Sequence, residues 1–532
     1  MSTFDVIVVG SGFGGGTAAL RLAQAGKRVC VLERGRRWRG KNLPASSDAQ
    51  PSTQFPEFGD RHLLWGRQFL FPTRQRLGLV QLRLMRELFA YSAAGLGGGS
   101  LIWSNVVVKP LDSVFEQGWP RGMTRQALEP YYARAAVYLK PSLVPGVPLV
   151  PDLVKGRRVA RAELHHETAA KLGYQWAPAH TAVHFGDEVT PHSLGHGKAK
   201  QMGCNYCGLC NSGCPQGAKN QIDLTYIAEA EALGADVRPL HEVTALEPQL
   251  DGYRVHYKRY ALNGRLVERG HLDARRVVLS LGTFSTNEFL LRARASDLLP
   301  MLSPTLGTQF SPNGNATGGG VKPGKPDPAV NLNDGPAITG LIDMKDCVIE
   351  DLVIPPWAVG FVGASLLTKL IFVAKSVLGL KVDLEAEKRR AKDVALWGGN
   401  GMDSSCGQLK LNPLGMLTLE WPGGLANDPI YAKMHAAMDS LARAQGRTYI
   451  PYIASIFGKA ETVHPLGGCR MADRPQEGVV DPFGRVFGYP GLYIADGSVV
   501  PTALGRNPSF TIAALAERVA DGVLSDMESR KS

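Results

Sequence analysis

The sequence predicts an α/β fold, in which a Rossmann-type dinucleotide-binding domain is joined to a second, α+β domain. Three observations indicate this. An apolar strand, a glycine-rich turn and a helix follow one another in residues 4–26, a second glycine-rich loop lies at 93–100, and a strand–glycine–helix unit at 276–291 is able to return to the same sheet. The chain has 532 residues, which is enough for two or three domains around a large buried core.

The N-terminal unit alternates strand and helix in the order of a βαβ unit. Residues 4–9 form a short apolar run that predicts a buried parallel strand. Residues 17–25 have helical periodicity and are followed by Gly26, which predicts a helix that ends at this glycine. Residues 27–32 predict the next strand, so the glycine-rich turn connects a strand to a helix.

The glycines of this first turn have spacings that suit a pyrophosphate. Gly10 allows a tight turn, Gly12 lets the backbone approach the phosphates, and Gly15 lets helix and strand pack closely. The helix N-terminus offers free N–H groups to the phosphates, and Glu33, at the end of the second strand, is able to accept from ribose hydroxyls. We therefore predict a site for FAD or NAD, since a glutamate here favours an unphosphorylated ribose; the alternative is an ordinary βα turn.

The second glycine-rich loop, at 93–100, is predicted to touch the same cofactor. Its backbone N–H groups are able to press against a flat ring or a phosphate. Residues 236–243 predict a strand near the place where such a fold holds an adenine, which adds Val243 to the site. A plain structural turn is the alternative for these segments. The predicted contacts of the loop are Gly97, Gly98, Ser100 and Asn105.

Four short motifs follow one another near the C-terminus. They are HPLGGC (464–469), GRV (484–486), LYIADGS (492–498) and NP (507–508). This order, together with the two glycine loops, resembles the glucose–methanol–choline (GMC) flavoprotein oxidoreductases, and most of all their cholesterol-oxidase-like branch. The resemblance covers nearly the whole chain. It implies that the cofactor is FAD and that the chain is an enzyme acting on CH–OH donors.

The resemblance also implies roles for three residues of these motifs. His464 corresponds to the active-site histidine, Asn507 to the asparagine beside it, which also contacts the cofactor, and Asp496 to an aspartate facing the flavin ribityl or phosphate region. The residue chemistry agrees, because hydride transfer from an alcohol needs a group that orients and deprotonates the hydroxyl. A histidine is able to accept that proton, and an asparagine bonds the oxygen without titrating. The alternatives are a structural histidine before a proline and an aspartate that caps the next turn.

A third catalytic residue and the domain boundaries also come from the resemblance. In the sterol-oxidase-like branch a glutamate of the substrate domain assists, and Glu350 is the candidate by position. The FAD-binding domain is expected to be discontinuous and the substrate domain to fill the rest. The expected FAD-binding segments are 1–150, 200–300 and 460–532, and the substrate-binding segments are 150–200 and 300–460.

Four cysteines form one continuous run, C-x2-C-x2-C-x3-C-P, which is the bacterial ferredoxin spacing. The run also resembles the cysteine segment of bacterial FAD glucose dehydrogenases, relatives with a three-iron cluster, although Cys207 departs from that pattern and leaves room for a fourth iron. We predict an iron–sulfur cluster, 3Fe–4S or 4Fe–4S, that passes electrons to a one-electron acceptor. Zinc, or free thiols including a redox disulfide pair, are the alternatives. The predicted ligands are Cys204, Cys207, Cys210 and Cys214.

The substrate prediction depends on the apolar stretch 352–380. It contains a rigid Pro-Pro-Trp loop and helical periodicity over 366–378, and it suggests a bulky hydrophobic alcohol such as a sterol or terpenoid. This segment is interpreted as a lid, a membrane-facing helix or a core helix. Two other functions stay open: an O2-using oxidase with an unmetallated cysteine segment, and a non-catalytic flavin subunit for electron transfer.

The net charge and the number of cysteines limit which partners and which cell compartment we expect. The net charge of +11 favours an acidic cytochrome or ferredoxin as electron acceptor, or peripheral contact with an anionic membrane. We expect no nucleic acid partner, because no nucleic-acid-binding signature is present. Eight cysteines do not make a disulfide framework and no secretory signal is recognised, so we expect a cytoplasmic protein, with attachment to the inner membrane left open.

Overall fold

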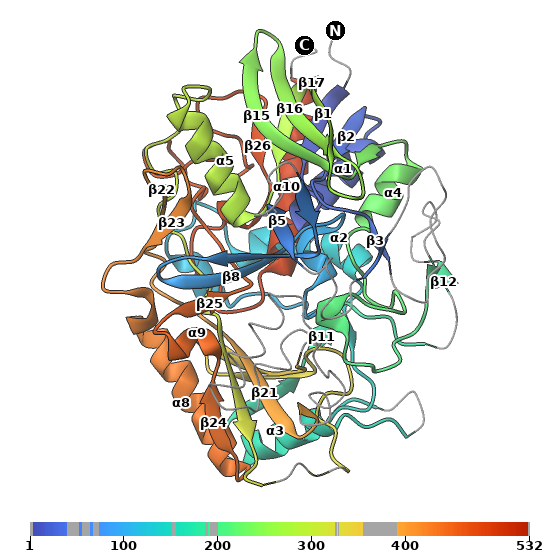
Figure 1. Cartoon of the computed structure of the whole chain (residues 1–532), viewed down its shortest axis with the longest axis vertical. Helices are drawn as coiled ribbons and strands as arrows, with labels where there is room; N and C mark the ends of the chain where they lie inside the picture. The colour runs from blue at the N-terminus through green and yellow to red at the C-terminus, as the bar shows by residue number, and fades with distance from the viewer. Residues whose placement is uncertain are drawn as a thin grey trace.

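A computed structural model describes ten segments of the chain. These are residues 4–39, 53–55, 64–67, 74–151, 156–186, 190–191, 200–324, 327, 329–354 and 391–529. The two ends of the described chain lie close together at the top of Figure 1, and two sheets stand one above the other.

The first sheet has a parallel core and an antiparallel extension (Figure 1). The long strand β17 belongs to both: its first half pairs antiparallel with β16, and its second half pairs parallel with β1 on one side and β26 on the other. The apolar β1 and β2 are almost entirely buried, as expected of parallel strands covered on both faces. The strands are β1 (Phe4–Val9), β2 (Val29–Leu32), β14 (Asp236–Arg238), β15 (His241–Gln249), β16 (Gly252–Tyr260), β17 (Leu266–Leu279) and β26 (Leu492–Ile494).

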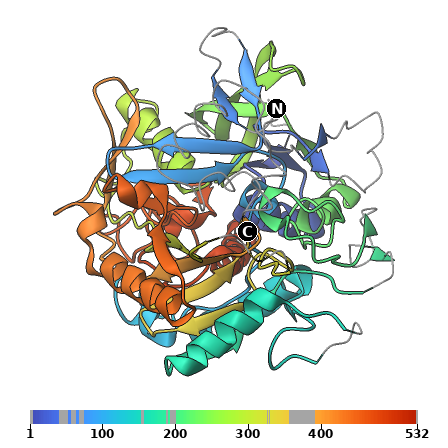
Figure 2. The ribbon, with the colours of Figure 1, turned by 60° about the horizontal axis from the view of Figure 1, so that its bottom comes forward.

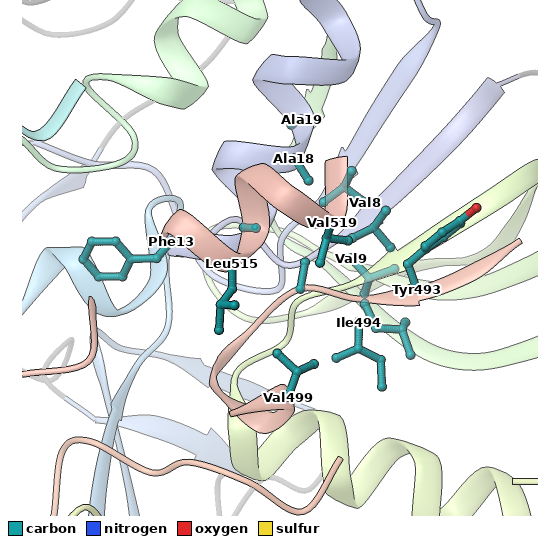
Figure 3. Packing of buried hydrophobic residues seen from close by; sticks show 14 of the residues in the cluster. Val8, Val9, Phe13, Ala18, Ala19, Tyr493, Ile494, Val499, Leu515 and Val519 are labelled. Carbon is teal, nitrogen blue, oxygen red and sulfur yellow. The ribbon is translucent and has the colours of Figure 1, made fainter. Parts of the chain in front are cut away.

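Helices α1 and α10 pack together against this parallel core, as Figure 3 shows from close by. Small side chains at Ala18 and Ala19 let α1 approach, while Val519 of α10 lies beside Val8 of β1. Each such aliphatic side chain is nearly or fully buried and contributes about 1.5–3 kcal/mol to folding. The helices around this sheet are α1 (Phe13–Gln24), α2 (Arg125–Leu139), α4 (Tyr226–Ala232), α5 (Thr283–Ala295) and α10 (Ser509–Glu528).

The second sheet is antiparallel, and helices α3 (Ala160–Lys171) and α8 (Pro429–Ala444) cover one of its faces (Figure 2). On that face Cys347, Ile349 and Trp397 pack into the apolar cluster around α8. Because side chains alternate along a strand, the neighbouring Glu350 and Asn400 point to the opposite face. The strands, in sheet order, are β10 (Gln175–Pro178), β19 (Gly340–Asp343), β20 (Cys347–Leu352), β21 (Val394–Gly401), β18 (Ala316–Val321) and β24 (Thr448–Pro451).

Shorter elements connect the two sheets. The three-stranded sheet β25–β8–β7 brings the segment before His464 against residues 80–93. The remaining elements are β3 (Trp38–Arg39), β4 (Thr53–Gln54), β5 (Trp65–Arg67), β6 (Gln75–Leu77), β7 (Val80–Leu84), β8 (Leu88–Ala93), η1 (Gly98–Leu101), η2 (Asp112–Glu116), β9 (Ser142–Leu143), β11 (His180–Thr181), β12 (Thr190–Pro191), β13 (Lys200–Gln201), η3 (Cys210–Ser212), β22 (Gln408–Leu411), β23 (Leu417–Glu420), η5 (Leu425–Asn427), α9 (Ile453–Ile456), β25 (Ala460–Thr462) and η6 (Gly497–Val499).

The predicted fold class is confirmed, with differences at element ends. The first helix begins at Phe13, inside the glycine-rich turn, rather than at residue 17. The single strand predicted over 236–243 is two strands, because Pro239 and the left-handed Leu240 (φ 63°) turn the chain between them. The domain boundaries stay a prediction. Within the described ranges, no helix is long and apolar enough to cross a membrane. The apolar segment 355–380 lies outside the described residues.

Candidate functional site

A cavity of about 1600 Å³ runs from the N-terminal glycine turn, past the second glycine loop, to the HPLGGC motif. A pocket for one drug-sized ligand usually has about 300–1,000 Å³. This cavity therefore has room for a dinucleotide and a second molecule. Both glycine loops contribute to its wall with Gly10, Gly12, Gly14, Gly98 and Gly99.

In the first turn, Gly10 and Gly15 stand at positions where a larger residue would clash with the backbone. Gly10 has φ 93°, and an added Cβ would lie 2.2 Å from the carbonyl oxygen of Ser280. At Gly15 it would lie 2.0 Å from the carbonyl oxygen of Gly10, so Gly15 packs the helix against the turn and does not line the cavity. Gly12 does line it and faces Gly98, where a Cβ would lie 2.6 Å from the Gly12 Cα. The two glycine loops thus touch each other.

Glu33 stands at the end of β2, buried, with its carboxylate against the first turn. Its Oε2 accepts from the Ser11 N–H (3.2 Å) and Oγ–H (2.7 Å), and its Oε1 accepts from the Gly35 N–H (2.8 Å). Glu33 also lines the cavity. A carboxylate has about four acceptor positions, so this one holds the turn and keeps capacity for a hydroxyl group of a ligand.

Of the residues predicted in and after the second loop, one lines the cavity and the others are buried behind its wall. Gly98 lines the cavity, whereas Gly97 and Ser100 lie behind it, where the Ser100 Oγ donates to the Gly97 carbonyl (2.7 Å) and accepts from the Ile222 N–H (3.0 Å). Asn105 is fully buried with φ 68°, and both atoms of its amide lack a hydrogen-bond partner among the described residues. An unpaired buried amide costs about 1–3 kcal/mol, and Asn105 itself does not line the cavity, so its predicted contact with the cofactor stays a prediction.

These features fit the predicted FAD. The glycine cradle and the Glu33 carboxylate, which line the same cavity, suit a long dinucleotide. Val243 of β15 lines the far end of the same cavity, as predicted for the adenine region.

Asp496 also lines the cavity, but protein groups already use its carboxylate. Its Oδ1 accepts from the N–H and Oγ–H of Ser498, and its Oδ2 accepts from the Gly282 N–H and the Thr286 Oγ1–H. Asp496 therefore ties the start of η6 to the start of α5. Asp496 thus caps the turn η6, which is the alternative given for it above, and its contact with a flavin stays a prediction.

The three predicted catalytic residues meet around a fourth residue, Asn400 of β21. The His464 Nδ1 lies 2.7 Å from the Asn400 Oδ1, and the Asn400 Nδ2 donates to the Glu350 Oε2 at 3.2 Å. The Asn507 Nδ2 donates to the same Glu350 oxygen at 3.4 Å. His464 lines the cavity, whereas Glu350 and Asn507 are buried behind His464 and do not line the cavity.

Burial sets the charge states of this group. His464 is half-buried in the cavity wall, and its partial removal from water lowers its pKa to about 4. Burial also raises the pKa of Glu350 to about 8. Both side chains are therefore neutral at pH 7. The Glu350 Oε1 and the Asn507 Oδ1 have no hydrogen-bond partner among the described residues, so two polar atoms remain unused beside His464.

Sequence reasoning missed Asn400. The signal was present in Trp397-Gly-Gly-Asn-Gly401, where one asparagine stands between glycines of a strand. Large neighbours leave no room for side chains at Gly399 and Gly401, since an added Cβ would lie 2.8 Å from the Met434 Sδ and 2.3 Å from the Ile430 Cγ1.

The mouth of the cavity was also not predicted. Leu414 and Met416, between β22 and β23, line it and are 81% and 53% exposed. Phe284 and Phe289 of α5 line it nearby. Part of the cavity wall is therefore apolar.

The prediction of metal ligands in the cysteine run is not supported. All four cysteines line one small cavity together with Lys219, but no three or more His, Cys, Asp or Glu side chains in the described part of the chain form a group that could hold a metal ion. Burial raises the pKa of the Cys204 and Cys214 thiols, so both are protonated in this structure. The run forms a thiol-lined cavity. The turn η3 lies between the two cavities, since Cys210 lines the small cavity and Asn211 lines the main one.

Comparisons with known proteins show the family and the fold. A family model described as "GMC oxidoreductase" matches residues 430–516, and one described as "FAD binding domain" matches residues 5–50. The chain is 30% identical to the cholesterol oxidase of Mycobacterium tuberculosis (strain ATCC 25618 / H37Rv), over 97% of this chain and 90% of the relative. It is 27% identical to the cholesterol oxidase of Acinetobacter baumannii, over 97% and 93%, and 23% identical to the long-chain-alcohol oxidase FAO4B of Arabidopsis thaliana, over 99% and 68%.

Two solved structures share the fold. The pyridoxine 4-oxidase of Mesorbium loti superposes with a TM-score of 0.61 at 14% identity, covering 98% of this chain and 99% of that one. A fungal aryl-alcohol oxidase superposes with a TM-score of 0.57 at 15% identity, covering 99% and 100%.

Proposed function

The chain belongs to the GMC oxidoreductase family, and on that premise we propose that it oxidises a bulky, apolar alcohol to the carbonyl compound with FAD as hydride acceptor. The observation that carries the proposal is the neutral His464 in the cavity wall, with Glu350 and Asn507 immediately behind it. A neutral imidazole is a suitable acceptor for the proton of an alcohol.

The chain's own groups have separable tasks in this reaction. The two glycine loops and Glu33 would hold the dinucleotide, which supplies the hydride acceptor when it is bound. His464 takes the hydroxyl proton on the ring nitrogen that faces the cavity. Glu350, protonated at neutral pH, is able to donate a hydrogen bond through Oε1, and Asn507 is able to accept one through Oδ1.

The apolar mouth supports the substrate class. Leu414, Met416, Phe284 and Phe289 present hydrocarbon to a molecule entering the cavity. The relatives named above carry the names cholesterol oxidase and long-chain-alcohol oxidase, and both names describe large apolar alcohols. A sterol, a terpenoid or a long-chain alcohol is therefore the proposed substrate.

O2 is the proposed electron acceptor. The predicted iron–sulfur outlet needs a metal-binding group that the four cysteines do not form, and the relatives above are named oxidases. Oxidation of one alcohol then releases two electrons and two protons, which convert one O2 to one hydrogen peroxide. Iron and acid-labile sulfide near three or four per chain in anaerobically purified protein would instead favour a one-electron acceptor such as an acidic cytochrome or ferredoxin.

The direct test is anaerobic bleaching of the flavin absorbance. The purified protein is mixed separately with a sterol, a long-chain alcohol and a sugar, and we expect rapid bleaching with the first or second and none with the sugar. Air should then restore the absorbance and yield hydrogen peroxide equal to the carbonyl product. If no alcohol bleaches the flavin, the proposal is wrong; if only the sugar does, its substrate class is wrong.

A further inference from the structure

We infer that Asn315 and Asn400 form a relay that keeps the proton of the neutral His464 on Nδ1, leaving Nε2 free to accept a proton. The role of this arrangement in turnover rests on the proposed function, but the tautomer itself does not. Neither asparagine lies in a sequence motif discussed above. The relay begins at backbone groups, and each step follows from which atoms donate and which accept.

The amide orientation of Asn315 is fixed at both ends by the main chain. Its Oδ1 accepts from the Val463 N–H at 2.8 Å, and its Nδ2 donates to the Gly399 carbonyl at 3.0 Å. A backbone N–H only donates and a backbone carbonyl only accepts. A reversed amide would therefore place donor against donor at Val463 and acceptor against acceptor at Gly399.

Asn315 in turn orients Asn400. The Asn315 Nδ2 donates a second hydrogen bond to the Asn400 Oδ1 at 3.0 Å, so this side of the Asn400 amide is its oxygen. The other side, Nδ2, then points to the Glu350 Oε2, where it donates. Asn400 is only 1% exposed, so no bulk water substitutes for either partner.

The orientation of Asn400 decides the tautomer of His464. The His464 Nδ1 lies 2.7 Å from the Asn400 Oδ1, and an amide oxygen only accepts, so Nδ1 carries the hydrogen. In a neutral imidazole the second nitrogen, Nε2, then has a free lone pair. This is the form that a general base requires.

Sheet geometry brings the four residues together. Asn400 pairs with Val348 across β20 and β21, so it stands diagonally to Glu350, which pairs with Gly398. Residues two apart on neighbouring strands share a face and remain within reach of side chains. One asparagine thereby connects the acid–base histidine to the buried carboxyl group.

The tautomer is measured directly by NMR of the holoenzyme labelled with nitrogen-15 histidine. The His464 signals are those absent from a His464→Gln variant. We expect a protonated Nδ1 and a bare Nε2 at neutral pH, and a substantial shift of the proton to Nε2 in Asn400→Leu and in Asn315→Leu. A proton on Nε2 in the unmodified protein, or unchanged signals in both variants, would overturn the relay.

Kinetics provide a second readout. Asn400→Leu should slow flavin reduction by about 100-fold or more, with substrate affinity changed by less than about threefold, because the base is lost and not the binding surface. Asn400→Asp should recover part of the rate, since a carboxylate still accepts from Nδ1–H. It should also move the pH–rate midpoint upward, because a negative charge raises the imidazole pKa. An unchanged midpoint would contradict the inference. Glu350 on β20 and Glu461 on β25 are the neighbouring titratable groups, so the same titration must distinguish their pKa values from that of the His464 imidazole.

A matched control separates positioning from stability. Asn220 is equally buried, donates to the Leu139 carbonyl at 2.7 Å and accepts from the Gln201 Nε2 at 2.8 Å, away from the cavity. Asn220→Asp should leave the His464 tautomer and the rate of flavin reduction unchanged. Equal losses of rate in Asn220→Asp and Asn400→Asp would contradict the relay. If no alcohol reduces the unmodified protein, the proposed function fails, whereas the NMR result stands independently.

Discussion

At the scale of single residues, the site is governed by burial. His464 loses its charge and Glu350 keeps its proton because the first is half-buried and the second fully buried, and no lysine or arginine of the described chain forms an ion pair with Glu350. A carboxyl group that stays protonated in this way is unfavourable for folding above its usual pKa. The same desolvation makes both groups suitable for proton transfer.

Replacing His464 by alanine should slow flavin reduction by at least about 100-fold, the usual scale for a lost acid–base group. Anaerobic stopped-flow measurement with the best alcohol gives the rate, and flavin absorbance confirms that the variant still holds its cofactor. A flavin-loaded variant that is reduced at the normal rate would remove His464 from the mechanism.

Glu350→Gln should stabilise the protein at alkaline pH. The folded carboxyl has a pKa of about 8 and the unfolded one about 4.5, so between these values the unfolded state releases a proton that the folded state keeps. Stability therefore falls as pH rises through this window, by about 3 kcal/mol at pH 7. Thermal unfolding should show a higher Tm for the variant at pH 8 than for the unmodified protein, and a much smaller difference at pH 5. An equal difference at both pH values would contradict the raised pKa.

At the scale of elements, close backbone approach builds the cofactor cradle. The β1–α1 turn and η1 meet at Gly12 and Gly98, and η1 has no space for a side chain at Gly98, because its Cβ would lie 2.6 Å from the Gly12 Cα. Ser11 reinforces this contact, because its Oγ accepts from the Gly97 N–H at 3.1 Å while it donates to Glu33. The two loops predicted separately from the sequence are thus one structural unit.

Gly98→Ala should lower the FAD content per chain. Gly98 has φ 54°, where a side chain costs about 1–2 kcal/mol, and its Cβ would lie 2.6 Å from the Gly12 Cα. Gly26→Ala is the matched control, since Gly26 has φ 69° and an added Cβ would meet nothing within 4 Å. The ratio of flavin to protein absorbance measures the effect, and an equal ratio in both variants would show that the contact does not shape the cofactor site.

At the scale of the whole molecule, the main cavity draws its walls from segments far apart in the chain. Residues of β1, β2, β15, α5 and the C-terminal motifs line it, and the second sheet supplies Asn400 and Glu350 behind His464. A molecule that fills the cavity contacts all of these segments at once. The bound cofactor therefore contributes to the stability of the entire fold.

Removal of FAD should lower the Tm, and its return should restore it. A ligand that binds only the folded state at about 1,000 times its Kd stabilises by about 4 kcal/mol. Differential scanning calorimetry of the apo and reconstituted protein measures this. A Tm that does not depend on FAD concentration would show that the cavity is not the cofactor site.

The sequence by itself determined the features that depend on local order. The first turn, with Gly10, Gly12 and Glu33, and the motifs around His464 and Asn507 fixed the cofactor and the family, because glycine spacing and strand–helix alternation are short-range properties. Tertiary structure alone decided how distant residues combine. It placed Asn400 between Glu350 and His464, since strand register and sheet pairing set which side chains share a face. It also bears on the cysteine run: the spacing suits a cluster, but in the described part of the chain the four side chains form no group that could hold a metal ion, because ligand geometry depends on how the loop packs in three dimensions.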